Sequence, residues 1–149
     1  ISLKKKIYEK KLQVNFLENL LVEAKELIQE NYYNYNITHM IINKYILNGK
    51  SYKNFINDLN ADNLSLEINF KCIQKKLLLK ISDILNKYHI EIDRFLDLKY
   101  TNSLFPDENV DLVKNCYKVL DGFNENEVNL VPKNIKKTGF FEKFFQLFS

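Results

Sequence analysis

The chain is poor in the two residues that make tight turns. It has three glycines and two prolines among 149 residues. Antiparallel sheets joined by tight hairpins depend on glycine-containing turns, so this scarcity favours helices over a strand-and-turn fold. The composition therefore predicts a helical protein.

Arginine and clustered metal ligands are scarce as well. Arg94 is the one arginine among 22 basic residues, and proteins that read base sequence usually use arginine for bidentate contacts. Cys72 and Cys116 are far apart, and the chain has two histidines, whereas a structural zinc site needs four clustered ligands. We expect no nucleic-acid partner, no metal and two buried, reduced thiols.

Long apolar runs and catalytic motifs are also missing from the sequence. No run reaches the roughly 18 apolar residues of a membrane span, so we expect no membrane partner. The chain has no Walker A phosphate-binding loop, and its motifs do not assemble a nucleophile, a base and an orienting group. We therefore expect a binding module that is not an enzyme and holds no cofactor.

The residues that are present are enough for a packed core. Hydrophobic residues make up 46% of the chain, charged residues 28%, and the net charge is +3, as expected of a globular domain. Apolar residues recur three or four positions apart, which is the spacing of one helix face. This pattern predicts helices at residues 16–28, 38–48, 51–59, 62–68, 73–85 and 116–120, and one beginning near 93.

A weak internal repeat relates these segments. Residues 33–45 return as residues 88–100, and four positions recur as identities: Tyr33, Ile37, Lys44 and Tyr45. The helices before and after also match in order, with the length differences in loops such as 101–109. A repeat of this kind predicts one helical unit used twice.

The first copy reads Tyr33-Asn34-Tyr35-Asn36-Ile37-Thr38-His39-Met40-Ile41, with Gly49 after it. In the second copy Asp93-Arg94-Phe95-Leu96 stands at the place of the central motif. This unit resembles the Clp N-terminal repeat, which occurs twice at the front of ClpA-, ClpB- and ClpC-type AAA+ unfoldases. His39 matches the family's histidine and Gly49 matches its turn. The resemblance implies an all-α fold of about eight helices, arranged as two pseudo-twofold-related four-helix repeats.

The resemblance also implies a domain organisation. Residues 1–15 are an N-terminal arm, either a targeting remnant or a helix start. Residues 16–135 are the double-repeat domain, with repeats at about 16–68 and 73–130. Residues 136–149, which carry five phenylalanines, are an aromatic linker toward an ATPase domain that this chain does not contain.

The function implied by the resemblance is docking for an ATP-dependent Clp chaperone, which unfolds proteins for proteolysis or refolding. The expected partners are unfolded substrates or adaptor proteins, with a Clp protease subunit reached through the absent ATPase domains. The isolated domain is expected to be a monomer and the full-length protein a hexamer. Together with the ClpC-like module, a composition typical of an AT-rich genome suggests a plastid, apicoplast-like location; otherwise the domain is soluble and intracellular. The open alternative is an unrelated helical protein–protein interaction or scaffold domain.

Six residues are candidates for binding a substrate or adaptor: Tyr33, Tyr35, Thr38, His39, Asp93 and Arg94. The tyrosines offer large amphipathic contact areas, although packing between helices explains them equally well. Thr38 and Asp93 match positions where ClpC-type domains use a glutamate to bind phosphoarginine, and threonine has no carboxylate for this. His39 is more simply a structural residue bonded to the neighbouring repeat, and Asp93 a carboxylate at a helix start.

Overall fold

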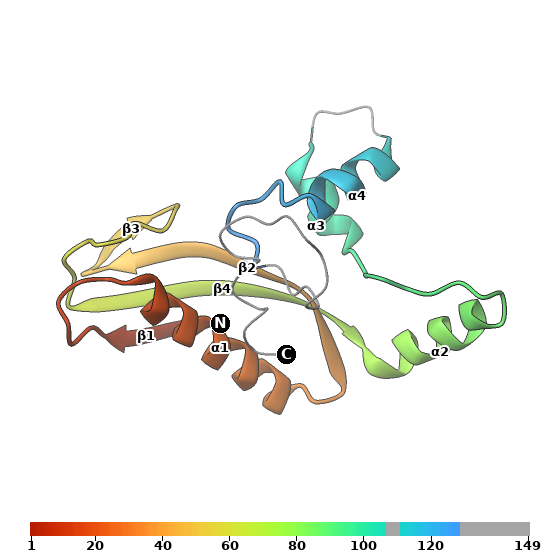
Figure 1. The fold of residues 1–149 in the computed structure, drawn as a ribbon, viewed down its shortest axis with the longest axis horizontal. Coiled ribbons are helices and arrows are strands. Elements are labelled where there is room, and N and C mark those ends of the chain that lie inside the picture. The colour runs from red at the N-terminus through yellow and green to blue at the C-terminus, as the bar shows by residue number, and fades with distance from the viewer. Residues whose placement is uncertain (107–110, 129–149) are drawn as a thin grey trace. The chain divides into compact units, whose positions relative to one another are not determined.

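The computed structural model describes residues 1–106 and 111–128, and it is a mixed α/β fold (Figure 1). Four strands form one antiparallel sheet in the order β1-β4-β2-β3. The elements in chain order are β1 (Ser2–Lys6), α1 (Val14–Asn31), β2 (Tyr35–Leu47), β3 (Lys50–Tyr52), β4 (Asn63–Gln74), α2 (Lys75–Asn86), α3 (Leu98–Leu104) and α4 (Leu112–Leu120).

The chain divides into two compact units. The first contains Ile1–Tyr33 and Ile41–Phe70, and the second contains Asn34–Met40 and the described residues from Lys71 onward. The long strands β2 and β4 therefore contribute residues to both units.

The all-α prediction is wrong, because the middle of the chain forms strands. The helices predicted at 16–28 and 73–85 are confirmed as α1 and α2, and the one at 116–120 lies within α4. The segments 38–48 and 62–68, predicted as helices, lie in β2 and β4. The predicted helix at 51–59 is the end of β3 followed by a loop.

The sequence of β4 shows why a strand forms there. Apolar and polar residues alternate through Leu64, Leu66 and Ile68, and these three side chains are at most 2% exposed. Alternation with a period of two places every second side chain on one face of a sheet, whereas a helix needs steps of three and four. The helix prediction overlooked this difference in period.

The turn between β2 and β3 uses one of the few glycines. Asn48 and Gly49 have φ values of +49° and +82°, and Leu47 pairs with Lys50 across the turn. Two consecutive positive φ values are typical of the type I′ hairpin turn, for which Asn-Gly is a favoured pair. One glycine at the right position was enough, so the low glycine content did not exclude a sheet.

The internal repeat is not a structural repeat. Residues 35–45 lie in β2, whereas the matching residues 90–97 have no regular secondary structure and α3 begins at Leu98. Two segments with similar sequences therefore adopt different conformations, and the pseudo-twofold double repeat implied by the Clp resemblance is contradicted. The predicted aromatic linker at 136–149 lies outside the described residues.

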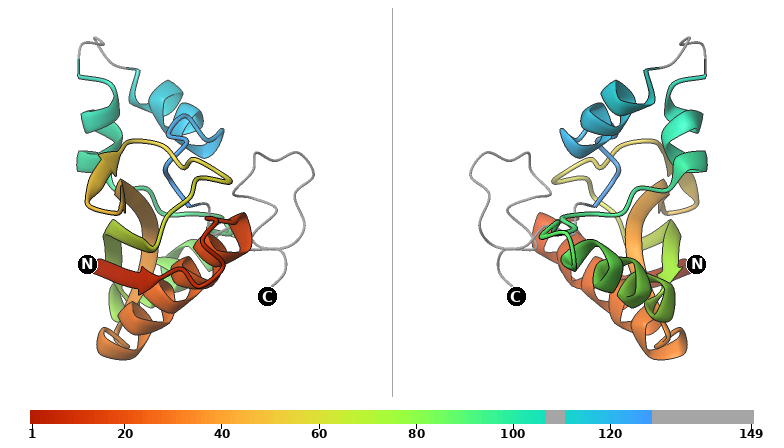
Figure 2. Two further views of the ribbon diagram at one scale, coloured as in Figure 1. Left: turned by 90° about the vertical axis from the view of Figure 1, so that its left-hand side faces the viewer. Right: turned by 90° about the vertical axis from the view of Figure 1, so that its right-hand side faces the viewer.

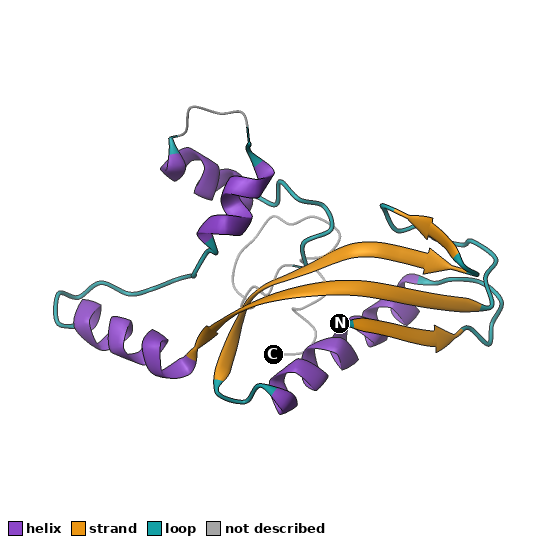
Figure 3. Cartoon of the chain, turned by 180° about the vertical axis from the view of Figure 1, so that it is seen from behind, coloured by secondary structure: helices purple, strands orange, loops and turns teal. Residues whose placement is uncertain are grey.

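The core of the first unit forms where α1 packs on the sheet. The N-terminal residues that were expected to form an arm or helix start form β1, in which Lys5 pairs with Leu64 of β4. Paired residues share a face of an antiparallel sheet, and Lys5 forms an ion pair with Glu23 of α1. The face of Leu64 is therefore the face toward α1, which runs along the strands (Figures 2 and 3). Five α1 residues are buried: Leu17, Leu20, Leu21, Ala24 and Ile28.

The second unit contains the remaining helices. α3 and α4 lie beside each other (Figure 1). Asp97 caps α3 by accepting a hydrogen bond from the Tyr100 amide (2.7 Å), and Asp111 caps α4 by accepting from the Val113 and Lys114 amides. An aspartate at such a position pairs amides that the helix leaves unpaired. Among the described helices, none is long and apolar enough to cross a membrane.

Candidate functional site

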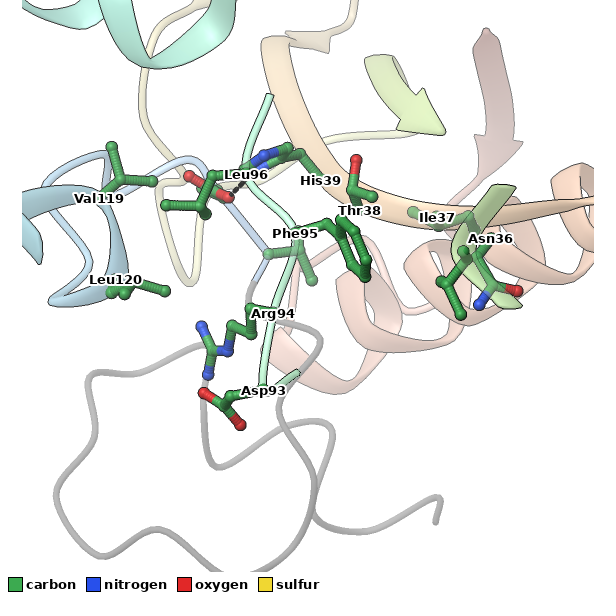
Figure 4. A pocket seen from close by; sticks show the side chains of 13 residues that line it. Asn36, Ile37, Thr38, His39, Asp93, Arg94, Phe95, Leu96, Val119 and Leu120 are labelled. Atoms are coloured by element: carbon green, nitrogen blue, oxygen red, sulfur yellow. Dashed lines mark hydrogen bonds and ion pairs between the residues drawn. The ribbon is translucent and has the colours of Figure 1, made fainter. Parts of the chain in front are cut away.

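The candidate site is a pocket within the second unit, with a volume of about 170 Å³ (Figure 4). Residues from the start of β2, from the extended segment before α3, and from the end of α4 form its walls. The walls are mixed, with nearly as many polar as apolar residues, and Thr38, Asp93 and Arg94 are among the polar ones. The apolar lining residues are Ile37, Leu78, Phe95, Leu96, Val119, Leu120 and Val128.

Four of the six candidate binding residues line this pocket: Thr38, His39, Asp93 and Arg94. Thr38 and His39 come from β2, and the other two from the segment before α3. Asp93 is exposed and Arg94 half-buried, and Figure 4 shows both side chains at the same end of the pocket. The fold thus brings together residues that are far apart in the sequence.

The two tyrosine candidates are not among the pocket residues. Tyr35 lies one residue before the lining, at the start of β2, and its hydroxyl accepts a hydrogen bond from Gln74 Nε2 (3.4 Å). Tyr33 belongs to the first unit and is 68% exposed. The structure therefore places neither tyrosine in the pocket lining.

His39 is almost fully buried, at 1% exposure, and both of its ring nitrogens are engaged. Its Nδ1 lies 2.6 Å from Glu127 Oε1, and its Nε2 accepts a hydrogen bond from the Asp97 main-chain N–H (2.9 Å). Because Nε2 accepts, it carries a lone pair, and the proton on Nδ1 is donated to Glu127. The network thus selects one neutral tautomer and leaves neither nitrogen free for proton transfer to a ligand. His39 lies inside a strand, so its expected place at a helix start is wrong.

Glu127 links His39 to α3. Its second oxygen accepts a hydrogen bond from the Tyr100 hydroxyl (2.5 Å), and that hydroxyl accepts one from Asn124 Nδ2 (3.0 Å). Burial, together with the bond to Glu127, raises the pKa of Tyr100 well above its ordinary value. The Tyr100 ring also lies beside the His39 ring, with centroids 4.8 Å apart. This network holds β2, α3 and the segment after α4 together behind the pocket.

Hydrogen bonds to main-chain carbonyls also join β2 to the segment after α4 and hold the start of α3. The Val128 amide donates to the Met40 carbonyl (2.8 Å). In α3, the Thr101 hydroxyl is fully buried and donates to the Asp97 carbonyl (3.0 Å). The back wall of the pocket is therefore a hydrogen-bonded structure, whereas its lining combines apolar and polar side chains.

Asp97, Tyr100 and Glu127 were missed by the sequence reasoning. A signal existed for Asp97, because an aspartate before a short helical stretch is a common N-cap. Glu127 is separated from His39 by 88 residues, and nothing in a local sequence window connects them. Tyr100 was noticed only as a repeat of Tyr45, which hid its separate role.

The size of the pocket restricts what it can hold. Pockets for drug-sized molecules usually measure about 300–1,000 Å³, and this one is smaller. Its volume matches one or two amino-acid side chains better than a nucleotide or flavin. Asp93 and Arg94 at the mouth supply an acceptor and donors, which suit the polar groups of a peptide backbone.

Within the described residues, no group of three or more His, Cys, Asp or Glu side chains is arranged to hold a metal ion. Both cysteines are free. Cys72 is exposed and Cys116 half-buried, so the prediction of two buried thiols is wrong for Cys72.

Comparison with known proteins identified no relative: no family model matches the chain, and neither a curated protein nor a solved structure matches it.

Proposed function

We propose that this domain is a non-catalytic protein-interaction module whose second unit binds a short segment of a partner protein. The observation that carries the proposal is the pocket between the start of β2, the segment before α3 and the end of α4. Its apolar lining residues, such as Phe95, Leu96 and Leu120, would receive one apolar side chain of the partner. Arg94 and Asp93 would bond the partner's adjacent backbone.

The state of His39 supports binding over catalysis. A general base needs a nitrogen that can take a proton from a substrate. The two His39 nitrogens are used by Glu127 and the Asp97 amide, and this makes the histidine a support for the pocket wall. Preorganised walls lower the cost of ordering a site on binding.

The narrower role as a Clp docking domain depended on an all-α double repeat. Because the fold contradicts that repeat, the resemblance no longer supports a Clp ATPase partner or a plastid location. The alternative function, a protein–protein interaction domain, does not need the repeat. We propose it for an α/β domain in place of a helical one.

Selection from a displayed library of random short peptides tests the proposal. We expect enriched peptides to share one apolar anchor residue, and binding to be measurable by fluorescence polarisation. The substitution Leu120→Arg should weaken this binding by at least about tenfold, because a charged side chain would have to be buried in the pocket. Leu120 is only partly buried, so we expect the domain to fold normally.

Val113→Arg is the matched control, because Val113 lies on the same helix, is 63% exposed and does not line the pocket. It should bind the selected peptides as the unaltered protein does. Equal enrichment on the Leu120→Arg protein, or loss of binding in both variants, would contradict the proposed site.

A further inference from the structure

α2 is an amphipathic helix whose apolar side is not buried. None of its 12 residues, all within the described part of the chain, is buried. Leu77 is 48% exposed and Ile84 57% exposed. Most helices in globular proteins are stabilised by burying an apolar face, and an isolated helix of this length is marginal in water. Within the described structure the apolar face of α2 is therefore only partly covered, and its exposed part can meet a partner.

The apolar residues of α2 form one stripe. Helical spacing places five residues on a single side: Leu77, Leu78, Ile81, Ile84 and Leu85. Leu78 also reaches the pocket described above, whereas Leu77 and Ile84 are the most exposed members of the stripe. Tyr88 and Ile90, which follow the helix, are 72% and 51% exposed. Leu79 is the exception, because its position in the helix is on the polar side.

The charged residues of α2 are mostly cationic. Lys75, Lys76 and Lys80 lie in the helix and Lys87 is its C-cap residue, against the single acid Asp83. Figure 1 shows α2 apart from α3 and α4 within the second unit. The helix therefore combines an aliphatic stripe with an excess of positive charge.

We infer that α2 docks on an anionic lipid surface. A helix with an aliphatic face and lysines on its polar side is typical of segments that lie in the headgroup region, with the apolar face inserted and the lysines near anionic headgroups. Tyrosine is favoured at the same depth, and Tyr88 lies immediately after the C-cap residue of the helix. Leu78 is shared with the proposed peptide pocket, but the inference depends on Leu77 and Ile84, which do not line that pocket.

Charge and composition disfavour other occupants of this face. A second copy of α2 would bring two lysine-rich helices together, and their lysines would repel each other. Asp83 is the only acidic residue of the helix that could offset this repulsion. The centres of protein interfaces are enriched in aromatic residues, methionine and arginine and depleted in lysine. The stripe on α2 is entirely aliphatic, which fits acyl chains better.

The first test is flotation of the protein, as the full chain, with vesicles of phosphatidylcholine containing about 30 mol% phosphatidylserine. We expect flotation with these vesicles and little with pure phosphatidylcholine. Sodium chloride at about 0.5 M should reduce it by screening the lysines. The double substitution Leu77→Ser with Ile84→Ser should lower the binding constant at least about tenfold.

Matched controls separate α2 from the rest of the surface. Val113→Ser with Tyr117→Ser removes two equally exposed apolar residues from α4 and should leave flotation unchanged. Lys76→Glu with Lys80→Glu should abolish flotation. Lys99→Glu with Lys114→Glu, which makes the same change in net charge on α3 and α4, should reduce it much less. Equal losses in both lysine pairs, or no flotation of the unaltered chain, would overturn the inference.

Insertion itself can be measured because the chain contains no tryptophan. In Leu77→Trp, the emission should shift to the blue on adding anionic vesicles and be quenched by brominated lipids. In Val113→Trp, it should not change. Sedimentation in the absence of lipid tests the other occupant: self-association that Leu77→Ser with Ile84→Ser abolishes would assign the face to a second copy and overturn lipid docking.

Discussion

The two units of this protein are stabilised by different kinds of core, and one tyrosine in each shows the contrast. In the first unit, Tyr45 is 1% exposed and its hydroxyl has no hydrogen-bond partner in the described structure. In the second, the buried Tyr100 donates to Glu127 and accepts from Asn124. An apolar core accepts an unpaired hydroxyl because the buried ring outweighs its cost. A polar core is stable only when its members pair with one another.

The largest effect is expected from removing apolar contacts in the first unit. Leu21 is fully buried on α1. Because Leu21→Ala leaves a cavity at this position, the free energy of unfolding should fall by about 3 kcal/mol. Urea denaturation measures the loss. Leu27→Ala, at a 37% exposed position of the same helix, should cost less than about 1 kcal/mol. Similar losses at both positions would show that α1 does not bury the face assigned to it.

The next effect should come from breaking the polar network of the second unit. Glu127→Ala leaves the His39 Nδ1–H and the Tyr100 hydroxyl without their acceptor, and we expect a loss of about 2 kcal/mol. The Asp97 amide, which donates to His39, should exchange its hydrogen faster as the ring loses its anchor. Glu127→Gln keeps one acceptor oxygen, so its free energy of unfolding should lie between those of the unaltered protein and Glu127→Ala. Unchanged exchange at Asp97 would mean that Glu127 does not hold the ring.

One residue of the second unit does not follow its polar pattern. Asn115 on α4 is 1% exposed, and neither amide atom has a hydrogen-bond partner in the described structure. Asn115→Leu should therefore raise the free energy of unfolding by about 1–2 kcal/mol, because it removes an unpaired buried amide and keeps the same number of side-chain heavy atoms. Asn124→Leu, which removes the bond to Tyr100, should lower it instead. Thermal denaturation of both variants decides the signs.

The tyrosine comparison can be tested directly by removing each hydroxyl. Tyr45→Phe should stabilise the protein by about 1 kcal/mol, since it deletes a buried group that lacks a partner. Tyr100→Phe should destabilise it by about the same amount, since it leaves Glu127 and Asn124 one bond short. Equilibrium denaturation at neutral pH gives both values. The same sign for both substitutions would remove the distinction between the two cores.

Alkaline pH provides the smallest and finest test. Burial raises the pKa of Tyr45 and of Tyr100 above the ordinary tyrosine value. Because the pKa is higher in the folded state than in the unfolded state, each neutral tyrosine contributes to the free energy of unfolding. This contribution is complete below about pH 10 and is lost as the pH rises from there toward the folded-state pKa. Each tyrosine should cost about 1 kcal/mol on going from neutral pH to about pH 11. Tyr45→Phe and Tyr100→Phe should each make the loss of stability at alkaline pH smaller by one tyrosine's contribution. Tyr8→Phe, at an 84% exposed position, should leave that loss unchanged.

Part of the fold was readable in the sequence. Helical spacing predicted α1 and α2, because their apolar residues recur at steps of three and four. The alternation of Leu64, Leu66 and Ile68 and the Asn48-Gly49 turn are equally visible signals of strands, and the prediction of a helix and a helix end at these places is wrong. In β2, four consecutive residues from His39 to Ile42 are buried, and a short buried run of this kind does not distinguish a strand from a helix.

The candidate site was less predictable than the fold. Thr38 and Asp93 were singled out through corresponding positions in a repeat that the structure does not contain. They nevertheless line one pocket, because the segment before α3 lies beside the start of β2. Their supports, Tyr100 and Glu127, are joined through hydrogen bonds that span 27 residues. Hydrogen bonds between residues so far apart in the sequence form because tertiary packing brings the residues together, and no local sequence pattern predicts them.

The sequence by itself determined the local features of this protein: the apolar stripes of α1 and α2, the period of two in β4, the hairpin turn and the aspartate cap of α3. These depend on neighbours within a few positions, where backbone geometry and side-chain chemistry act directly. Tertiary structure alone decided the tautomer of His39, the pairing of Glu127 with Tyr100, and the exposure of α2 among the described residues. Each of these depends on which distant groups share a low-dielectric interior, and that follows from the packing of the whole unit.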